Sequence, residues 1–361
     1  MRGVFARFRA SGVFQHAAPF GGGYINESFL VTAGDETGAR RYVLQCLNDD
    51  VFRRPALVME NVQRVTQFLR VRLEQAGAPD AERRALRLIP TREREPFLVD
   101  VAGSCWRLYA YVERTHAHGA ARTPAQAFEA GRAFGEFQRL MADYDGPRLH
   151  ETIPRFHDTP ARVDTLRSVI AADPCGRAAT AGGEIDFALG RAAQSGLLED
   201  ALRTGDVPER IAHNDAKFSN VLLDDDSEEA MCVVDLDTVM PGTPLYDFGD
   251  MTRSMTSAAE EDDPRLEQVA ARMPCFEALA RGYLSEAGAF LTPTERDLLV
   301  AAGREITYEQ GVRFLTDHLD GDRYYKTWRA DHNLERARNQ FQLLRSLESL
   351  EGEMAQVVAR T

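Results

Sequence analysis

The alternation of hydrophobic and polar positions divides the chain into a strand-rich first third and a helical remainder. Residues 20–47 contain two β-prone runs on either side of a Gly/Asp turn, which predicts a hairpin. Residues 56–75 carry apolar side chains largely at helical spacing and predict one long helix. Three short apolar runs follow, at 85–89, 96–101 and 105–112. We therefore expect a small mixed lobe over residues 1–112.

A polar, glycine-containing stretch at 113–119 interrupts this pattern, and we expect it to link two lobes. From Pro124 onward the apolar spacing is helical. Helices are expected over 128–140, 164–170, 187–202, 251–255, 266–284, 293–319 and 333–354. The predicted fold is therefore α+β, with a larger, mostly helical lobe over residues 113–361.

Composition narrows the classes of function. A net charge of −13 argues against a nucleic-acid partner or an anionic membrane surface, because both require basic patches. The five cysteines lack C-x-x-C spacing, so a reducing cytosol is the expected compartment. Arginines interrupt the N-terminal apolar residues, and no apolar run approaches the roughly 20 residues of a membrane helix. We expect a cytoplasmic monomer or homodimer.

The residues most suited to chemistry cluster between positions 211 and 250. His213-Asn214-Asp215 is followed after four residues by Asn220, and Asp235 ends the next apolar run. This H-x-D and N spacing, with an aspartate on the following hairpin, is typical of phosphoryl-transfer enzymes that use ATP and Mg²⁺. An ordinary Asp/Asn-rich turn would explain residues 224–226, but it would not explain that spacing.

The residue types suggest separate roles. Asp215 is expected to orient an acceptor hydroxyl and to take its proton. Asn220 and Asp235 are expected to bind Mg²⁺, with Asp237 as an outer contact or a ligand of a second ion. Lys217 is a candidate contact to the transferring phosphate, with an ordinary surface lysine as the alternative.

The words HNDAKFSNVLL, VVDLDTVMPG and LYDFGD resemble the aminoglycoside phosphotransferase and choline kinase superfamily, whose fold is protein-kinase-like. Within this superfamily, four further segments are similar to the N-acetylhexosamine 1-kinases: GGGYINESF, YVLQCLNDDVFRRPALVMENV, GVRFLTDHLDGDRYY and HNLERARNQF. The resemblance spans most of the chain. It implies transfer of the γ-phosphate of ATP to a sugar, at the anomeric hydroxyl of an N-acetylhexosamine such as GlcNAc or GalNAc.

The resemblance also implies a nucleotide site in the first lobe. Gly22, Gly23 and Asn26 would lie in the loop over the ATP phosphates, and Glu60 would occupy the position of a glutamate that pairs with a lysine. Gln45 stands at the position of that lysine and, being neutral, cannot form the ion pair. The phosphate-neutralising cation is therefore left open, with Arg53, Arg54 and Lys217 as candidates.

For the acceptor, the resemblance implies a pocket lined by Arg313, Asp317 and Tyr325. The sequence Asp247-Phe248-Gly249 spells the kinase metal motif, but it comes too late in the chain, after a Pro-Gly turn. The resemblance gives Asp247 and Asp250 the role of bracing the catalytic loop, and we expect His213 to support that loop by hydrogen bonds.

Two alternatives remain open, and a third idea, a metal site at His116 and His118, is set aside. The acceptor could be another small alcohol: an aminoglycoside, choline, homoserine or a different sugar. The missing lysine also allows a catalytically silent ATP-binding protein, although intact Asp215, Asn220 and Asp235 argue against it. His116 and His118 suggest a metal site, but two histidines without a third ligand are expected to face solvent.

Overall fold

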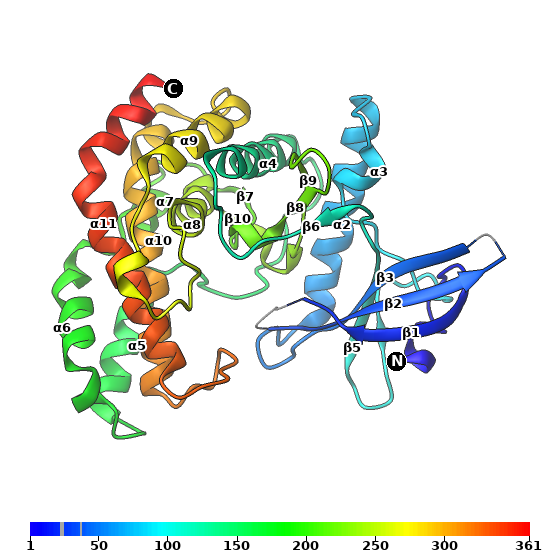
Figure 1. Cartoon of the computed structure of the whole chain (residues 1–361), viewed down its shortest axis with the longest axis horizontal. Helices are drawn as coiled ribbons and strands as arrows, with labels where there is room; N and C mark the ends of the chain where they lie inside the picture. Colours follow the sequence, from blue (N-terminus) through cyan, green and yellow to red (C-terminus); the bar gives the residue numbers. More distant parts are fainter. Residues whose placement is uncertain (22–24, 37) are drawn as a thin grey trace.

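The structure is a computed structural model that describes residues 1–21, 25–36 and 38–361. It confirms the predicted α+β fold: a small antiparallel sheet and one long helix lie beside a larger helical part (Figure 1). The predicted positions Gly22 and Gly23 lie outside the described residues. In the part of the chain that is described, no helix combines the length and the apolar character that crossing a membrane requires.

The sheet is antiparallel, in the order β1-β2-β3-β5-β4. Its strands are β1 Val13–Pro19, β2 Glu27–Asp35, β3 Gly38–Cys46, β4 Leu98–Val99 and β5 Cys105–Ala110. The predicted hairpin is β2 and β3, whereas the run at 85–89 forms only an isolated bridge between Leu88 and Tyr109. Sequence patterning misses β1 because its seven residues mix exposed and half-buried positions without alternation.

Successive residues of β3 serve the two faces of the sheet, as the pleat requires. Tyr42 and Leu44 pack with Phe5 and Phe8 of the N-terminal segment, which includes α1 Arg2–Phe5. On the other face, Val43 packs in the core that contains the apolar side of the long helix α2 Pro55–Gln75. The short helix α3 Ala81–Arg84 follows α2.

The larger part is helical. Its helices are α4 Pro124–Ala142, α5 Thr159–Ala172, α6 Gly182–Arg191, α7 Leu197–Thr204, α8 Pro244–Thr256, α9 Met273–Ala287, α10 Pro293–Leu319 and α11 His332–Arg360. The helix expected at 187–202 is two helices, because Gly196 adopts φ +99° and Glu305 accepts hydrogen bonds from the amides of Gly196 and Leu198. Helix α8 begins before the expected 251, where Thr243 caps it ahead of Pro244.

Helices α4 and α9 pack at unusually close range through glycines. A Cβ added at Gly282 would lie 2.1 Å from the carbonyl oxygen of Phe128, and one added at Gly131 would lie 2.6 Å from that of Leu279. Any side chain at either position would push the two helices apart. Residues of both helices belong to the core that lies beside the catalytic loop. That core contains Phe134, Phe218 and Phe248.

Two small sheets position that loop. Strands β7 Arg210–Ala212 and β10 Met240–Gly242 form one antiparallel pair. Strands β6 Thr115–His116, β8 Val221–Asp224 and β9 Ala230–Val233 form the other sheet. The catalytic loop runs from β7 to β8, so its two ends are fixed in different sheets.

Candidate active site

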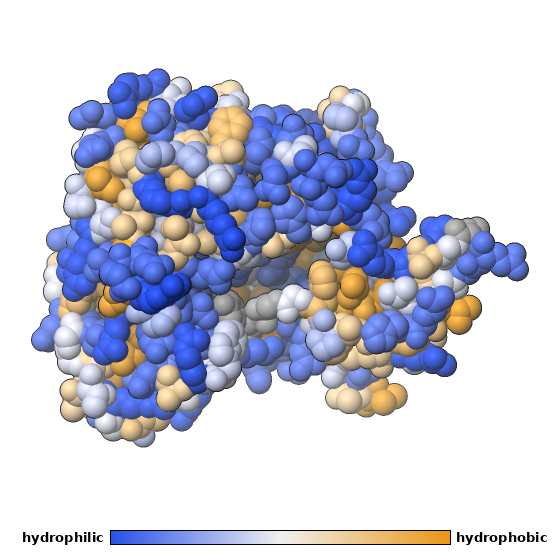
Figure 2. Space-filling view, in the orientation of Figure 1, coloured by the Kyte–Doolittle hydropathy of each residue, from blue (hydrophilic) through white to orange (hydrophobic). Residues whose placement is uncertain are grey.

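A cleft of about 820 Å³ lies between the strand-bearing part and the helical part. Figure 2 shows the surface hollowed between these two parts. The walls come from both parts, and Asp215, Asn220 and Asp235 are among the lining residues. The polar residues expected to perform the chemistry therefore share one cavity.

Asp215 is held by two neighbours in its own loop. Its Oδ2 atom accepts hydrogen bonds from Nζ of Lys217 and from Nδ2 of Asn220, each at 2.8 Å. No described residue donates a hydrogen bond to Oδ1, and about a quarter of the side chain is exposed within the cleft. One carboxylate oxygen is fixed by the protein, and the other is available to a ligand.

Electrostatics keep Asp215 ionised. Burial alone would raise its pKa, but the charge and hydrogen bond of Lys217, with help from Asn220, lower the pKa to about 2. Lys217 therefore serves as the partner of Asp215 in this structure and is not an isolated surface lysine. A carboxylate that is charged near neutral pH is suited to orienting a hydroxyl proton.

Asp247 braces the catalytic loop from below. Its fully buried carboxylate accepts hydrogen bonds from the amides of His213 (2.9 Å) and Asn214 (2.7 Å) and from Nε2 of Gln138 (2.6 Å). Asn214 adopts the left-handed backbone conformation, with φ +63°. These contacts fit the support role that the sequence predicts for Asp247. Asp250 differs, because its Oδ1 accepts from Arg253 at 2.7 Å.

His213 is also structural in its contacts. It is fully buried, and its ring packs edge-on against Phe134 and Phe137. The Nε2–H group donates to the carbonyl of Val234 at 2.9 Å, and Nδ1 accepts from the amide of Asp215 at 3.3 Å. Both ring nitrogens are therefore occupied by contacts with the backbone of the loop and of the β8–β9 hairpin.

The β8–β9 hairpin brings Asn220 next to Asp235. Val221 pairs with Val233, and the amide of Val234 donates to the carbonyl of Asn220 at 2.9 Å. The Asp235 carboxylate is open to the cleft, and none of the described residues donates a hydrogen bond to it. Loss of bulk water and the nearby Asp237 and Asp215 carboxylates raise its pKa to about 6. A divalent cation would relieve this crowding of negative charge, so the oxygen ligands fit Mg²⁺.

Arg107 on β5 is a site residue that the sequence analysis missed. It is 1% exposed, and both terminal nitrogens of its guanidinium bond to the carboxylate of Asp237, through Nη1 to Oδ1 and through Nη2 to Oδ2 at 3.0 Å. Its Nε atom donates to Oε1 of Gln45 at 2.9 Å, because strand pairing places these two residues opposite each other. The arginine inside the buried run CWRLYA was the available signal, since a buried charge requires a partner.

The same network changes the interpretation of Asp237 and Asn26. Asp237 is 1% exposed, and Asn26 donates from Nδ2 to its Oδ2 at 2.7 Å. With Arg107 and Asn26 both bound to it, the Asp237 carboxylate joins the two lobes. These contacts favour a supporting position for Asp237 over direct metal binding.

Gln45 lines the cleft, whereas Glu60 does not. The carboxylate of Glu60 binds Arg64 and His150. The next residue, Asn61, is fully buried: Nδ2 donates to the carbonyls of His150 (2.8 Å) and Val239 (3.0 Å), and Oδ1 accepts from the His150 amide at 2.9 Å. Asn61 therefore attaches α2 to the larger lobe.

At the opposite wall, Arg313 of α10 points into the cleft. Its guanidinium carbon lies 4.7 Å from the ring centre of Phe156 and 5.8 Å from the rings of both Tyr324 and Tyr325. Its Nη1 atom donates to Oε1 of Gln310 at 3.2 Å. Tyr325 also lines the cleft, as the sequence predicts.

Asp317 does not line the cleft. Its carboxylate accepts hydrogen bonds from the amides of Arg323, Tyr324 and Tyr325 at 2.8–2.9 Å, and from Nδ2 of Asn333 at 2.9 Å. It is 6% exposed. The expected acceptor contact is therefore replaced by a structural one, in which Asp317 folds the loop that carries the two tyrosines.

The sequence model of a family described as "Phosphotransferase enzyme family" matches residues 16–288, more than half of the chain. The chain belongs to this family. Its predicted place in the aminoglycoside phosphotransferase and choline kinase superfamily is thereby confirmed. The narrower resemblance to N-acetylhexosamine kinases stays a prediction.

Solved structures with the same fold extend over nearly the whole chain. An aminoglycoside phosphotransferase from Alicyclobacillus acidocaldarius matches with a TM-score of 0.62 at 14% sequence identity. The match covers 100% of the chain described here and 97% of the Alicyclobacillus chain. Plasmodium vivax ethanolamine kinase matches with a TM-score of 0.56 at 10% identity, over 94% of the chain described here and 85% of the kinase chain. Choline kinase from Cryptosporidium parvum matches with a TM-score of 0.52 at 13% identity, over 96% of the chain described here and 92% of the kinase chain. At these identities, the similarity establishes the fold.

Proposed function

We propose that this phosphotransferase is an ATP- and Mg²⁺-dependent kinase that phosphorylates the anomeric hydroxyl of an N-acetylhexosamine. The observation that carries the proposal is the position of Asp215, whose Oδ2 is bound by Lys217 and Asn220 while Oδ1 is available in the cleft. That arrangement supports a carboxylate that receives a hydroxyl group. The fold, the family and the catalytic spacing all support phosphoryl transfer.

In this proposal the chain's own residues position the reactants. Oδ1 of Asp215 accepts a hydrogen bond from the acceptor hydroxyl and takes the proton late in the transfer. Lys217 keeps that carboxylate charged and contributes positive charge beside the transferring phosphate. Asn220 and Asp235 would hold a Mg²⁺ ion, and that ion would supply positive charge to neutralise the ATP phosphates. The transition state is loose, so placement of the hydroxyl matters more than its basicity.

The five cysteines form no disulfide in the described part of the chain, which suits a reducing cytosol with abundant ATP. Gly21 and Asn26, which line the cleft, would lie near the ATP phosphates. Arg107 supports this side of the cleft, and its positive charge is balanced by the paired carboxylate of Asp237. We propose a division into lobes at residues 112 and 113, with the nucleotide bound between them.

The acceptor wall supports a ligand rich in oxygen atoms. Arg313 covers the faces of Phe156, Tyr324 and Tyr325. A cationic head group could not stack on these rings without meeting the positive charge of Arg313. Arginine N–H groups instead suit hydroxyl and acetamido oxygens. This contact favours an N-acetylated sugar over choline.

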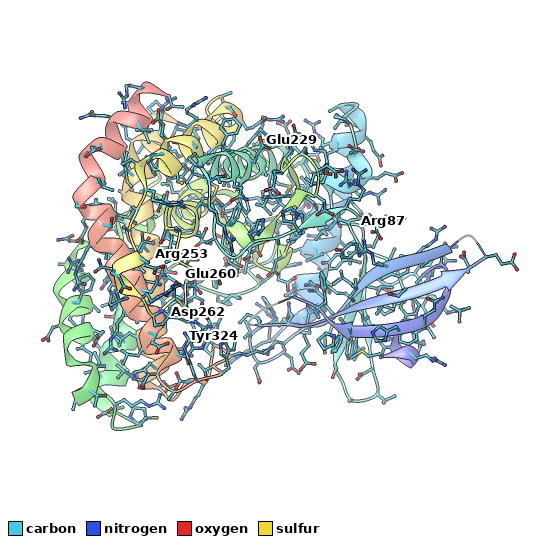
Figure 3. All side chains as sticks on the ribbon, in the orientation of Figure 1. Arg87, Glu229, Arg253, Glu260, Asp262 and Tyr324 are labelled. Atoms are coloured by element: carbon cyan, nitrogen blue, oxygen red, sulfur yellow. The ribbon has the colours of Figure 1, made fainter. Side chains whose placement is uncertain are left out.

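A cationic amino alcohol is the second candidate acceptor, and it rests on acidic residues at the same side of the cleft. Glu260, Glu261 and Asp262 line the cavity, as does Tyr324, and Figure 3 labels Glu260, Asp262 and Tyr324 on the helical part. Glu261 already pairs with Arg253, and Asp262 with His332. Only part of this negative charge is therefore available to attract a cation.

The acceptor is tested by ATP-dependent ADP release with GlcNAc, GalNAc, glucose, galactose, an aminoglycoside, choline, ethanolamine and homoserine. We expect the N-acetylated sugars to give the highest kcat/KM, and phosphorus-coupled NMR to locate the phosphate on the anomeric carbon. A phosphate on carbon 6, or a higher kcat/KM for an amino alcohol, would overturn the anomeric-kinase proposal.

The catalytic residue is tested separately with Asp215→Asn. Loss of a proton acceptor in the transition state should lower kcat by about 10²–10⁴-fold, while the dissociation constant for ATP changes little. Asp226→Asn is the matched control, because that exposed carboxylate pairs with Arg114 outside the cleft. Near-wild-type turnover of Asp215→Asn would remove Asp215 from the mechanism.

A further inference from the structure

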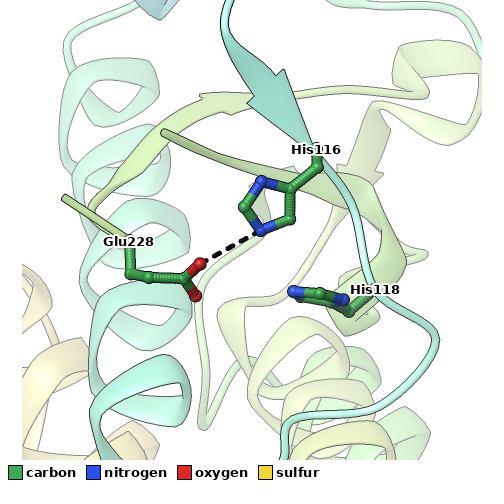
Figure 4. A group of neighbouring side chains, drawn as sticks. All are labelled: His116, His118 and Glu228. Atoms are coloured by element: carbon green, nitrogen blue, oxygen red, sulfur yellow. Dashed lines mark ion pairs between the residues drawn. The ribbon is translucent and has the colours of Figure 1, made fainter. Parts of the chain in front are cut away.

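A group of nitrogen and oxygen ligands lies at the linker between the lobes, apart from the Asn220–Asp235 pair. His116 ends β6, His118 follows two residues later, and Glu228 lies in the turn between β8 and β9. Figure 4 shows the carboxylate of Glu228 facing the two imidazole rings. One ligand atom from each residue lies within 4.8 Å of the other two. The structure thus supplies a third ligand that lies 110 residues further along the chain.

The contacts of His116 leave one ring nitrogen directed at a carboxylate. Nδ1 lies 2.8 Å from Oδ1 of Asp225, and Nε2 lies 3.3 Å from Oε1 of Glu228. If Nδ1–H donates to Asp225, neutral Nε2 presents a lone pair to the negative oxygen of Glu228. Either a proton on Nε2 or a metal cation between the two atoms would stabilise that approach. A neighbouring carboxylate on the distal nitrogen is the usual partner of a metal-bound histidine.

The separations are close to those of a tetrahedral site. Ligands at roughly 2.0–2.1 Å from Zn²⁺ lie about 3.3 Å apart, which matches the His116–Glu228 distance. His118 has to approach by side-chain rotation, and its ring is already 4.6 Å from the ring of His116, centre to centre. Two imidazoles and one carboxylate favour Zn²⁺ and similar transition-metal ions over Mg²⁺, which prefers oxygen ligands.

The backbone of the turn and one neighbouring side chain hold Glu228 in place. Its φ is +59°, in the left-handed region that costs a glutamate free energy. The carboxylate is also oriented by Nε2 of Gln126, which donates to Oε2 at 3.1 Å. Strained residues that the surrounding structure holds in place are concentrated at functional sites.

We propose that His116, His118 and Glu228 bind one divalent transition-metal ion of the Zn²⁺ class, with Asp225 orienting His116. The fourth position is open to water. Residues His116 and His118 line the cleft, so the ion fastens the interlobe linker to the β8–β9 turn at the cleft wall. The site requires no ATP and no acceptor, and it is independent of the proposed reaction.

The test uses the full chain without a histidine tag, in saturating Mg²⁺ so that the oxygen site is occupied. Zn²⁺ binding is measured by calorimetry, and Co²⁺ is added as a spectroscopic probe. We expect one equivalent of Zn²⁺ and an intense visible Co²⁺ absorption of the tetrahedral type. His116→Ala and His118→Ala should abolish both signals, and Asp225→Asn should weaken Zn²⁺ binding about 10–100-fold.

Two control variants match the ligands in residue type. His16→Ala removes an exposed histidine on β1, and Glu229→Gln changes the carboxylate next to Glu228; both should bind Zn²⁺ like the unaltered chain. Glu228→Gln should weaken binding at least tenfold. The absence of stoichiometric Zn²⁺ uptake would overturn the proposal and leave His116 as a protonated bridge. Unchanged binding in His118→Ala would also overturn it.

Discussion

The two walls of the cleft each carry a shielded arginine, but the two arginines are held differently. Arg107, on the strand side, donates to Asp237 through both terminal nitrogens and to Gln45 through Nε. Arg313, on the helical side, lies over three aromatic rings and donates to Gln310, with Glu309 3.8 Å away. The first arginine has its hydrogen-bonding directions filled by the protein, while the second keeps several for a ligand.

This difference separates a residue that builds a wall from one that can recognise a substrate. Burial and charge alone do not distinguish them, since both side chains are largely shielded from solvent. The two arginines are distinguished by the number of their N–H groups that already donate to protein acceptors. We therefore expect substitutions of Arg107 to change mainly folding stability, and substitutions of Arg313 to change mainly acceptor binding.

The largest expected effect is that of Arg107→Met on the free energy of unfolding. The substitution leaves the Asp237 carboxylate buried without its cation, which costs about 3–5 kcal/mol. Urea unfolding measures this loss, and Arg87→Met, at an exposed position of the same lobe, is the control. Adding Asp237→Asn should recover part of the loss. A change below about 1 kcal/mol would show that the pair does not hold the lobes together.

Arg313→Ala should act on the acceptor. Hydrogen bonds from a charged group contribute about 1.5–3 kcal/mol, so the KM for the sugar should rise about 10–100-fold with a smaller change in kcat. Contacts made equally before and during transfer change KM and not kcat. Arg304→Ala on the same helix pairs with Glu351 away from the cleft and serves as the control. An unchanged KM would remove Arg313 from the acceptor site.

Asp317→Ala tests whether the aromatic part of that wall depends on its loop. Three backbone amides and Asn333 lose their acceptor, which should cost about 1–3 kcal/mol of stability. The KM for the sugar should rise several-fold, because Tyr324 and Tyr325 lose their fixed positions. Thermal unfolding and acceptor kinetics measure the two effects, with the more exposed Asp320→Ala as comparison. A stable enzyme with normal kinetics would contradict the loop-folding role.

Gln45→Ala should have the smallest effect. Two hydrogen bonds are lost, from Arg107 to Gln45 and from Gln45 to Ser28, at a cost of about 0.5–1.5 kcal/mol each, while the charge of Arg107 remains. The kcat/KM for ATP should therefore fall less than about tenfold. A transition-state cation contact in phosphoryl transfer contributes about 10³-fold or more. A loss of that size would show that Gln45 itself carries the phosphate contact.

The catalytic loop was the part that the sequence predicted best. His213, Asp215, Asn220 and Asp235 lie within one short stretch, and the chemistry of phosphoryl transfer restricts their spacing. A tight hairpin then brings the last two together without help from distant residues. The assigned roles remain predictions, and so does the boundary between residues 112 and 113.

The rest depends on contacts between distant residues. Arg107 meets Asp237 across 130 positions, and pairing of β3 with β5 brings it to Gln45. Local propensity contains no information about such pairs. The same limit applies to Glu228, which completes a ligand group begun at His116. Helix breaks such as Gly196 depend on a partner elsewhere, in that case Glu305 on α10.

The attachment of α2 through Asn61 bears on how this enzyme can be controlled. In protein kinases, activity depends on where the corresponding helix lies relative to the sheet. Here three buried hydrogen bonds join Asn61 to His150 and Val239 of the larger lobe, so an outward swing of α2 would have to break all three. The sheet is joined to the larger lobe as well, through the contacts of Arg107 and Asn26 with Asp237. Both α2 and the sheet are therefore fixed relative to the catalytic loop by buried polar contacts in this structure.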